Sequence, residues 1–141
     1  MNKKVILTVA VLVVTVMCVA LLAACAPASD PDKAIAALEK NEYVAAKDAT
    51  IIPTALKLLG VKDIDCVVSG SAVVEDKDGN KSAETVTIVY FSSSDAATAA
   101  WDKVKSYAED KKEDKEDSNW VCKKSGKMIY YGTEAGVKAA R

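Results

Sequence analysis

The sequence of 141 residues contains no histidine. Histidine is the usual general base beside a serine or cysteine nucleophile, and it is the commonest metal ligand in proteins. Its absence excludes Ser–His and Cys–His catalysis and removes imidazole from any metal site. The serines lie mainly at expected helix starts and turns, where their hydroxyls bond to the backbone. No catalytic constellation is recognisable, so we expect a protein that is not an enzyme and has no cofactor.

An excess of positive charge is also missing. The chain has 19 Lys and Arg against 20 Asp and Glu, a formal net charge of −1. The part after residue 24 carries 17 of these basic residues and all 20 acidic ones, a charge of −3. Nucleic-acid binding needs a basic face that displaces counterions from phosphates. We therefore expect no nucleic-acid partner.

Acidic residues are absent from the first 24 positions, where two lysines near the start are the only charges. An uncharged, almost wholly apolar run from Val5 follows and ends in Leu22-Ala23-Ala24-Cys25. An aliphatic residue, two small residues and a cysteine at the end of such a run resemble the lipobox of bacterial lipoproteins. The resemblance covers residues 1–25.

This resemblance implies that residues 1–24 are a signal peptide and that Cys25 is the lipid-attachment site, the first residue of the mature chain. Two acyl chains on one cysteine, palmitate among them, suffice for stable membrane anchoring. The implied location is the extracytoplasmic face of the cell membrane, with the membrane as a partner through Cys25. A plain transmembrane anchor is the alternative, because the apolar run is long enough to span a bilayer.

The 117 residues after the signal peptide are enough for one domain and too few for two. We expect residues 25–29 to be the lipidated cysteine and a short tether, and residues 30–141 to be a single domain. Since each residue spans at most about 3.6 Å, the tether reaches less than about 20 Å. The domain must then lie close to the membrane.

Four helices are expected from their start and stop signals. Asp30 caps the first helix and Pro31 occupies its first position. The second begins near Ile52-Pro53 and is followed by Gly60 as its C′ residue. Residues 92–95 cap the third and longest, and Thr133 caps the last, over residues 134–141.

The strands are expected to form two hairpins. Alternation over residues 64–75 places Ile64, Cys66 and Val68 on a core face. Turn residues 76–81 lead to a return strand over 84–92, which is apolar on both faces and suits a central position. Residues 120–124 and 127–131 form the second hairpin around Ser125-Gly126, and residues 43–49 form a weak strand or an irregular segment. The expected fold is α+β, a two-layer sandwich: an antiparallel sheet of four to five strands covered by helices on one face.

The closing stretch, residues 125–133 followed by a short helix, looks like that of small uncharacterised lipoproteins of Gram-positive bacteria. The likeness covers about the last third of the chain. It carries no known activity and so implies nothing about chemistry.

Two acidic segments have features of a metal site. Asp76, Asp78 and Asn80 have the spacing of a calcium loop, but Lys81 stands where its glycine belongs and Thr87 where its bidentate acid belongs. We interpret this segment as a hairpin turn with Gly79 at a positive φ. The mixed-charge run 111–117 is interpreted as a solvated helix end, with a weak cation site as the alternative.

The aromatic residues are expected to serve mainly the core. Trp101 and Tyr107 repeat at helical spacing beside Val104, which predicts burial against the sheet. Tyr130 and Tyr131 are adjacent in a strand and must face opposite sides, so one of them is expected at the surface.

Cys66 and Cys122 are the cysteines left for the folded domain. Both lie in expected strands on what we interpret as the core face. A disulfide between them, two buried free thiols, or a redox function are the three alternatives.

These observations favour a non-enzymatic binding or accessory protein of the cell envelope, with an unidentified protein, envelope component or small molecule as ligand. A structural subunit with no ligand of its own is one alternative. The other is an enzyme that uses carboxylates alone, as glycosidases do.

Overall fold

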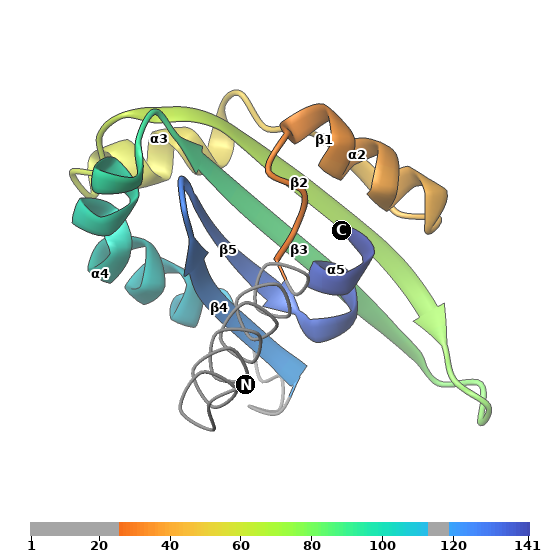
Figure 1. Ribbon diagram of the computed structural model, residues 1–141. Coiled ribbons are helices and arrows are strands. Elements are labelled where there is room, and N and C mark those ends of the chain that lie inside the picture. The colour runs from red at the N-terminus through yellow and green to blue at the C-terminus, as the bar shows by residue number, and fades with distance from the viewer. Residues whose placement is uncertain (1–25, 113–118) are drawn as a thin grey trace, which may run out of the picture.

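The computed structural model describes residues 26–112 and 119–141. Its strands form one antiparallel sheet in the order β1-β2-β3-β5-β4 (Figure 1). The strands are β1 Val44–Lys47, β2 Ile64–Glu75, β3 Lys81–Phe91, β4 Trp120–Ser125 and β5 Met128–Thr133. The helices are α2 Pro31–Lys40, α3 Ile51–Leu58, α4 Ser94–Asp110 and α5 Glu134–Ala139. The α+β class and the antiparallel sheet are confirmed.

Helices cover both faces of this sheet. On one side, here called the α2–α5 face, the core includes Leu38 of α2 and Val137 of α5. On the other side, the α3–α4 face, the core includes Leu56 of α3 and Val104 of α4. The expectation of helices on one face is therefore wrong. The central strands are apolar on both sides, so each side must be covered to remove it from water.

β3 is the central strand, as its doubly apolar run predicts. Val86 and Ile88 belong to the core of the α2–α5 face, whereas Val89 belongs to that of the α3–α4 face. The same alternation holds in β5, where Tyr130 and Tyr131 face opposite sides and are each 3% exposed. The expectation that one of these tyrosines is at the surface is wrong because neither face is left bare there.

A register shift near the start of β2 corrects the expected face pattern. The shift lies between Ile64 and Cys66, opposite the end of β3. Cys66 and Val68 pack against the core of the α2–α5 face, whereas Ile64 packs against the opposite core. An irregularity of this kind interrupts the alternation of a strand, so residues on its two sides no longer share a face by simple counting.

The helix signals are largely confirmed. The Asp30 carboxylate accepts hydrogen bonds from the Asp32 and Lys33 amides at 2.9 and 3.2 Å. Gly60 follows α3 with a φ of +84°. In α4, Val104 is fully buried as expected, but Trp101 is only partly buried at the rim of its core.

The start of the folded domain lies earlier than the sequence suggested. Ala26 is buried, and the Ala28 amide donates to the Ala140 carbonyl at 2.9 Å. The Ala28 carbonyl accepts a hydrogen bond from the Tyr90 hydroxyl at 2.8 Å. Residues 26–28 therefore belong to the domain, and the expectation that they form a free tether is wrong because core contacts and hydrogen bonds hold them.

Candidate functional site

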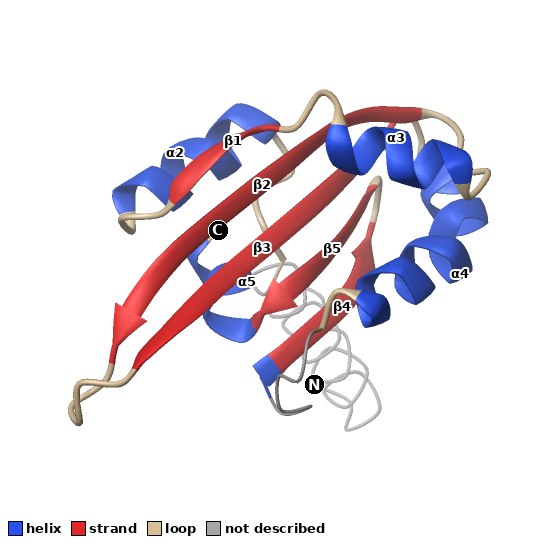
Figure 2. Ribbon diagram, turned by 180° about the vertical axis from the view of Figure 1, so that it is seen from behind, coloured by secondary structure: helices blue, strands red, loops and turns tan. Residues whose placement is uncertain are grey.

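The α3–α4 face is covered along only part of its length. Figure 2 shows α3 over the end where β2 begins and β3 finishes and α4 on the side of β5 and β4, while no described helix covers the rest of β2 and β3 on this side. Val44 of β1 is 81% exposed and Val73 of β2 is 72% exposed. We call this uncovered part of the sheet the open face.

Hydroxyl side chains line the open face in cross-strand rows. Ser69 of β2 pairs with Thr87 of β3, and Thr87 pairs in turn with Tyr131 of β5. One step along the strands, Ser71 pairs with Thr85. Directly opposed residues of antiparallel strands project to the same side, about 5 Å apart. The register therefore builds a small grid of hydroxyl groups, which is exposed at Ser71, partly buried at Ser69 and Thr85, and buried at Thr87 and Tyr131.

Two adjoining hollows give this grid the shape of a groove. One, of about 420 Å³, lies over β1, the middle of β2 and the Thr85–Thr87 stretch of β3. The other, of about 280 Å³, is lined by the start of α3, the end of α4, Trp120 and Tyr131. Thr85 and Thr87 line both hollows, so they form one groove, which we call the open-face groove.

Three aromatic rings form one wall of this groove. The Tyr131 ring lies edge-on to that of Tyr107, with 6.4 Å between centroids, and 6.2 Å from the Trp120 ring. Lys111 places its Nζ 5.2 Å from the Tyr107 centroid, a cation–π contact. Burial raises the pKa of Tyr131, against the opposing effect of the Thr87 hydroxyl, so Tyr131 stays neutral.

Two buried polar atoms of residues lining the groove lack a hydrogen-bond partner in the described part of the chain. They are Ser69 Oγ and Trp120 Nε1. An unsatisfied buried donor or acceptor costs about 1–3 kcal/mol, so native proteins rarely leave one without water or a ligand. β3 and β5 lie between the strands that carry them, so the two residues are about 14 Å apart across the sheet.

The acidic residue at the groove's end is already engaged. The Asp48 carboxylate accepts hydrogen bonds from the amides of Thr50, Ile51 and Ile52 at 2.9, 3.0 and 3.0 Å, and so caps α3. Burial opposes ionisation of this group, but the three amides together outweigh it and lower its pKa. Asp48 therefore serves the helix and is not free to act on a ligand.

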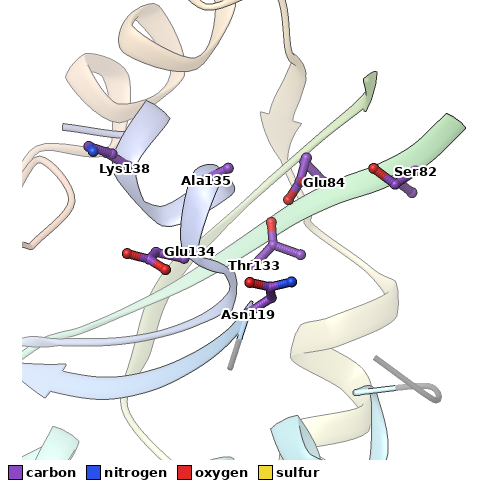
Figure 3. Close-up of a pocket in the computed structure, with 8 residues that line it drawn as sticks. Ser82, Glu84, Asn119, Thr133, Glu134, Ala135 and Lys138 are labelled. Atoms are coloured by element: carbon purple, nitrogen blue, oxygen red, sulfur yellow. The ribbon is translucent and has the colours of Figure 1, made fainter. Parts of the chain in front are cut away.

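A third hollow, of about 480 Å³ and separate from the groove, lies where β3 passes the start of α5. Glu84 and Glu134 both line it, and a carboxylate-dependent hydrolase would need two carboxylates in one hollow. Figure 3 shows the Glu134 carboxylate directed away from Glu84, with Thr133 between them. Acid–base hydrolysis needs two carboxylates that flank one bond. The hollow does not present such a pair.

The two cysteines of the domain are free thiols and lie far apart. Cys66 packs against the core of the α2–α5 face, whereas Cys122 packs against the opposite core. β3 and β5 lie between their strands. The disulfide alternative is therefore wrong in this structure, since a bridge needs Cα atoms about 4.4–6.8 Å apart. Burial raises the pKa of Cys66, and that of Cys122 to about 11, which disfavours the reactive thiolate.

The segment between β2 and β3 forms a hairpin turn, as expected, and Gly79 within it has a φ of +80°. The Asp76 carboxylate accepts from the amides of Asp78 and Asn80 at 2.8 and 2.9 Å, so the turn itself uses these oxygens. Within residues 26–112 and 119–141, no cluster of His, Cys, Asp and Glu could hold a metal ion. Most of the mixed-charge run 111–117 lies outside the described residues.

The expected signal peptide, with its lipobox-like end and Cys25, also lies outside the described residues. In the part that is described, no helix is long and apolar enough to cross a membrane. No known protein family, curated protein or solved structure matches this chain. The role of the open-face groove must therefore be inferred from the residues that line it.

The groove was missed at the level of sequence. The alternation over residues 64–75 leaves Ser69 and Ser71 on the face opposite Val68, but it does not show that this face forms a groove. Thr85 and Thr87 lie in a strand that appeared uniformly apolar. The available signal was a pair of small hydroxyl residues at alternate positions in each of two neighbouring strands.

Proposed function

We propose that this protein is a lipid-anchored, extracytoplasmic binding protein of the cell envelope and that the open-face groove takes its ligand. The observation that carries the proposal is the hydroxyl grid beside an aromatic wall, on a part of the sheet that none of the described helices covers. If this sheet served only stability, covering its open face would stabilise the protein further by removing exposed apolar side chains from water. Ser69 and Trp120, which line the groove, each also bury one polar atom that has no hydrogen-bond partner among the described residues.

The groove chemistry favours a neutral, hydroxyl-rich ligand. Asp48 is engaged by backbone amides, and Lys47 forms an ion pair with Asp32 at 3.0 Å. Lys111 lies over an aromatic ring. Hydroxyl rows can hydrogen-bond to sugar hydroxyls, and the rings of Trp120 and Tyr107 can pack against the apolar face of a sugar. Since the groove extends across several strands, we propose an extended glycan of the cell envelope.

The anchor part of the proposal is supported by the sequence of residues 1–25. The run of apolar residues ends in Leu22-Ala23-Ala24-Cys25, the arrangement that lipoprotein processing requires. Cys25→Ser is expected to abolish incorporation of radioactive palmitate and to leave a larger precursor. Cys18→Ser, which changes the other cysteine of the apolar run, is the matched control and is expected to incorporate label as the unaltered protein does. Equal label in all three proteins would refute the anchor.

The ligand part can be tested by titrating the purified lipoprotein, in detergent, with neutral glycan fragments from the cell wall of its host. Ser71 is exposed within the groove, so Ser71→Trp fills it without disturbing the core. We expect this change to weaken binding at least about tenfold. Ser106→Trp places the same side chain at an exposed position of α4 outside the groove and should bind normally. Unchanged binding by Ser71→Trp, or no binding by the unaltered protein, would sink the proposal.

A further inference from the structure

The chain before α2 is packed against the α2–α5 face. Ala26 and Pro27 are buried, and Ala28 packs against the same core. In Figure 1 this segment lies beside α5 and continues to α2. We call residues 26–28 the N-terminal strap.

Two hydrogen bonds tie the strap to separate parts of the fold. Its Ala28 amide donates to the carbonyl of Ala140, just after α5, at 2.9 Å. Its Ala28 carbonyl accepts from Tyr90 of the central strand at 2.8 Å. Burial raises the pKa of Tyr90, so this hydroxyl keeps its proton and remains a donor. The strap is thus fixed both to the middle of the sheet and to the C-terminal end of the chain.

The residue bonded to the strap is Cys25, the expected lipid-attachment site. Its Cα can lie only about 3.8 Å from that of Ala26. Acyl chains on Cys25 would therefore enter the membrane directly beside a buried part of the domain, with no free tether between them. We propose that the anchor holds the domain on the membrane in one orientation, with the surface around the strap and the end of α5 against the lipid headgroups. This inference rests on the lipid anchor of the proposed function.

Charge near the strap suits an anionic lipid surface. Lys138 and Arg141, at the end of α5, are exposed. Lys123 of β4 is exposed and pairs with Tyr130, which places it on the same face of the sheet. Basic side chains close to a membrane are attracted to anionic headgroups. Within α5 one basic residue, Lys138, is matched by one acidic residue, Glu134, and Arg141 after the helix adds a second positive charge.

This orientation has a consequence for the groove. The strap lies on the α2–α5 face, and the open-face groove lies on the opposite side of the same sheet. A domain held by its strap turns the groove away from the membrane. A ligand in the cell envelope could then reach the groove without passing between protein and lipid.

Fluorescence quenching on vesicles tests the orientation. The full lipoprotein is reconstituted in phosphatidylcholine vesicles with phosphatidylglycerol, some lipids carrying a spin label on the headgroup. A fluorophore is attached at Arg141→Cys, or at Thr98→Cys on the exposed side of α4, in a Cys66→Ala and Cys122→Ala background. We expect strong quenching at position 141 and little at position 98. Equal quenching at both positions would overturn the proposal.

An insertion provides the matched control. A Gly/Ser linker of about ten residues between Cys25 and Ala26 spans about 17 Å on average and leaves the strap sequence intact. The difference in quenching between positions 141 and 98 is expected to disappear in this variant. A difference that persisted with the linker would show that the strap does not set the orientation.

Amide hydrogen exchange separates this inference from the lipid anchor. In the unaltered lipoprotein in detergent micelles, we expect exchange of the Ala28 amide to be slowed by about 100-fold or more relative to an unstructured peptide. A palmitate-labelled protein with an unprotected Ala28 amide would overturn the fixed orientation alone. A protected Ala28 amide without palmitate label would overturn the anchor, and the membrane orientation with it.

Discussion

The hydroxyl of Thr133 bonds to the backbone of Thr85 on the β5 side of β3, where the ladder between the two strands ends. It accepts a hydrogen bond from the Thr85 amide at 3.1 Å and donates one to the Thr85 carbonyl at 3.2 Å. The same oxygen accepts from the Gly136 amide at 3.2 Å and so caps α5. One side chain thereby continues the sheet where the ladder of β3 and β5 ends and fixes the direction of the last helix.

Thr133→Val should destabilise the domain by about 1–3 kcal/mol, because the Thr85 amide and carbonyl and the Gly136 amide lose their partner while the shape is kept. Denaturant unfolding followed by circular dichroism measures the change. Thr133→Ser keeps the hydroxyl and is the control, with a loss of less than about 1 kcal/mol. Equal losses in the two variants would mean that the hydroxyl does not hold this junction.

Gly132→Ala should destabilise the domain by more than about 2 kcal/mol. Gly132 has a φ of +148°, and an added Cβ would collide with the Thr85 carbonyl and with Val86 Cα at 2.7 Å. Gly126→Ala is the control, since its φ is +57° and nothing lies within 4 Å of an added Cβ. Gly126→Ala should lower the free energy of unfolding only by the smaller strain of an alanine with a positive φ. Thermal unfolding of both variants decides whether the collision or the backbone conformation dominates.

Val104→Ala should lower the free energy of unfolding by about 1–3 kcal/mol, because it opens a cavity between α4 and the sheet. Val104 is fully buried in the core of the α3–α4 face. Asp102→Ala, at an exposed position of the same helix, should change the free energy of unfolding by less than about 0.5 kcal/mol. A Val104→Ala protein as stable as the unaltered one would contradict the packing of α4 on this face.

Cys66 and Cys122 should both react when a variant that begins at Ala26 is unfolded without reductant and alkylated. Intact mass spectrometry is expected to show two alkyl groups, because the two thiols lie on opposite faces of the sheet. The same treatment after reduction is the control and should add no further group. A protein that takes up alkyl groups only after reduction would establish a disulfide.

The partly buried thiol of Cys122 should make stability fall at high pH. Burial raises its pKa from 9.0 to about 11, so the folded state favours the neutral thiol. This contribution is fully present below pH 9.0 and is lost as the pH rises toward about 11, because the unfolded chain ionises first. The free energy of unfolding should decline less steeply in this window for Cys122→Ala. Identical slopes would show that the thiol is not buried in this way.

Local signals in the sequence determined much of the fold. The Asp30 cap, the Gly60 stop, the turn at 76–81 and the central position of β3 all depend on neighbouring residues or on the polarity of one strand. The sequence also carries the entire case for the anchor at Cys25, a pattern of consecutive residues that remains a prediction. Caps, turns and alternation are short-range effects, so a single sequence displays them directly.

Tertiary structure alone decided which faces were covered and what came together there. The second helical layer follows from how the helices pack, and the separation of Cys66 from Cys122 follows from the strand order. The register of β2 on β3 placed Ser69 beside Thr87. The ends of α3 and α4 then decided that this row stays open. Such relationships join residues far apart in the chain and depend on the pairing of whole strands, which local pattern does not encode.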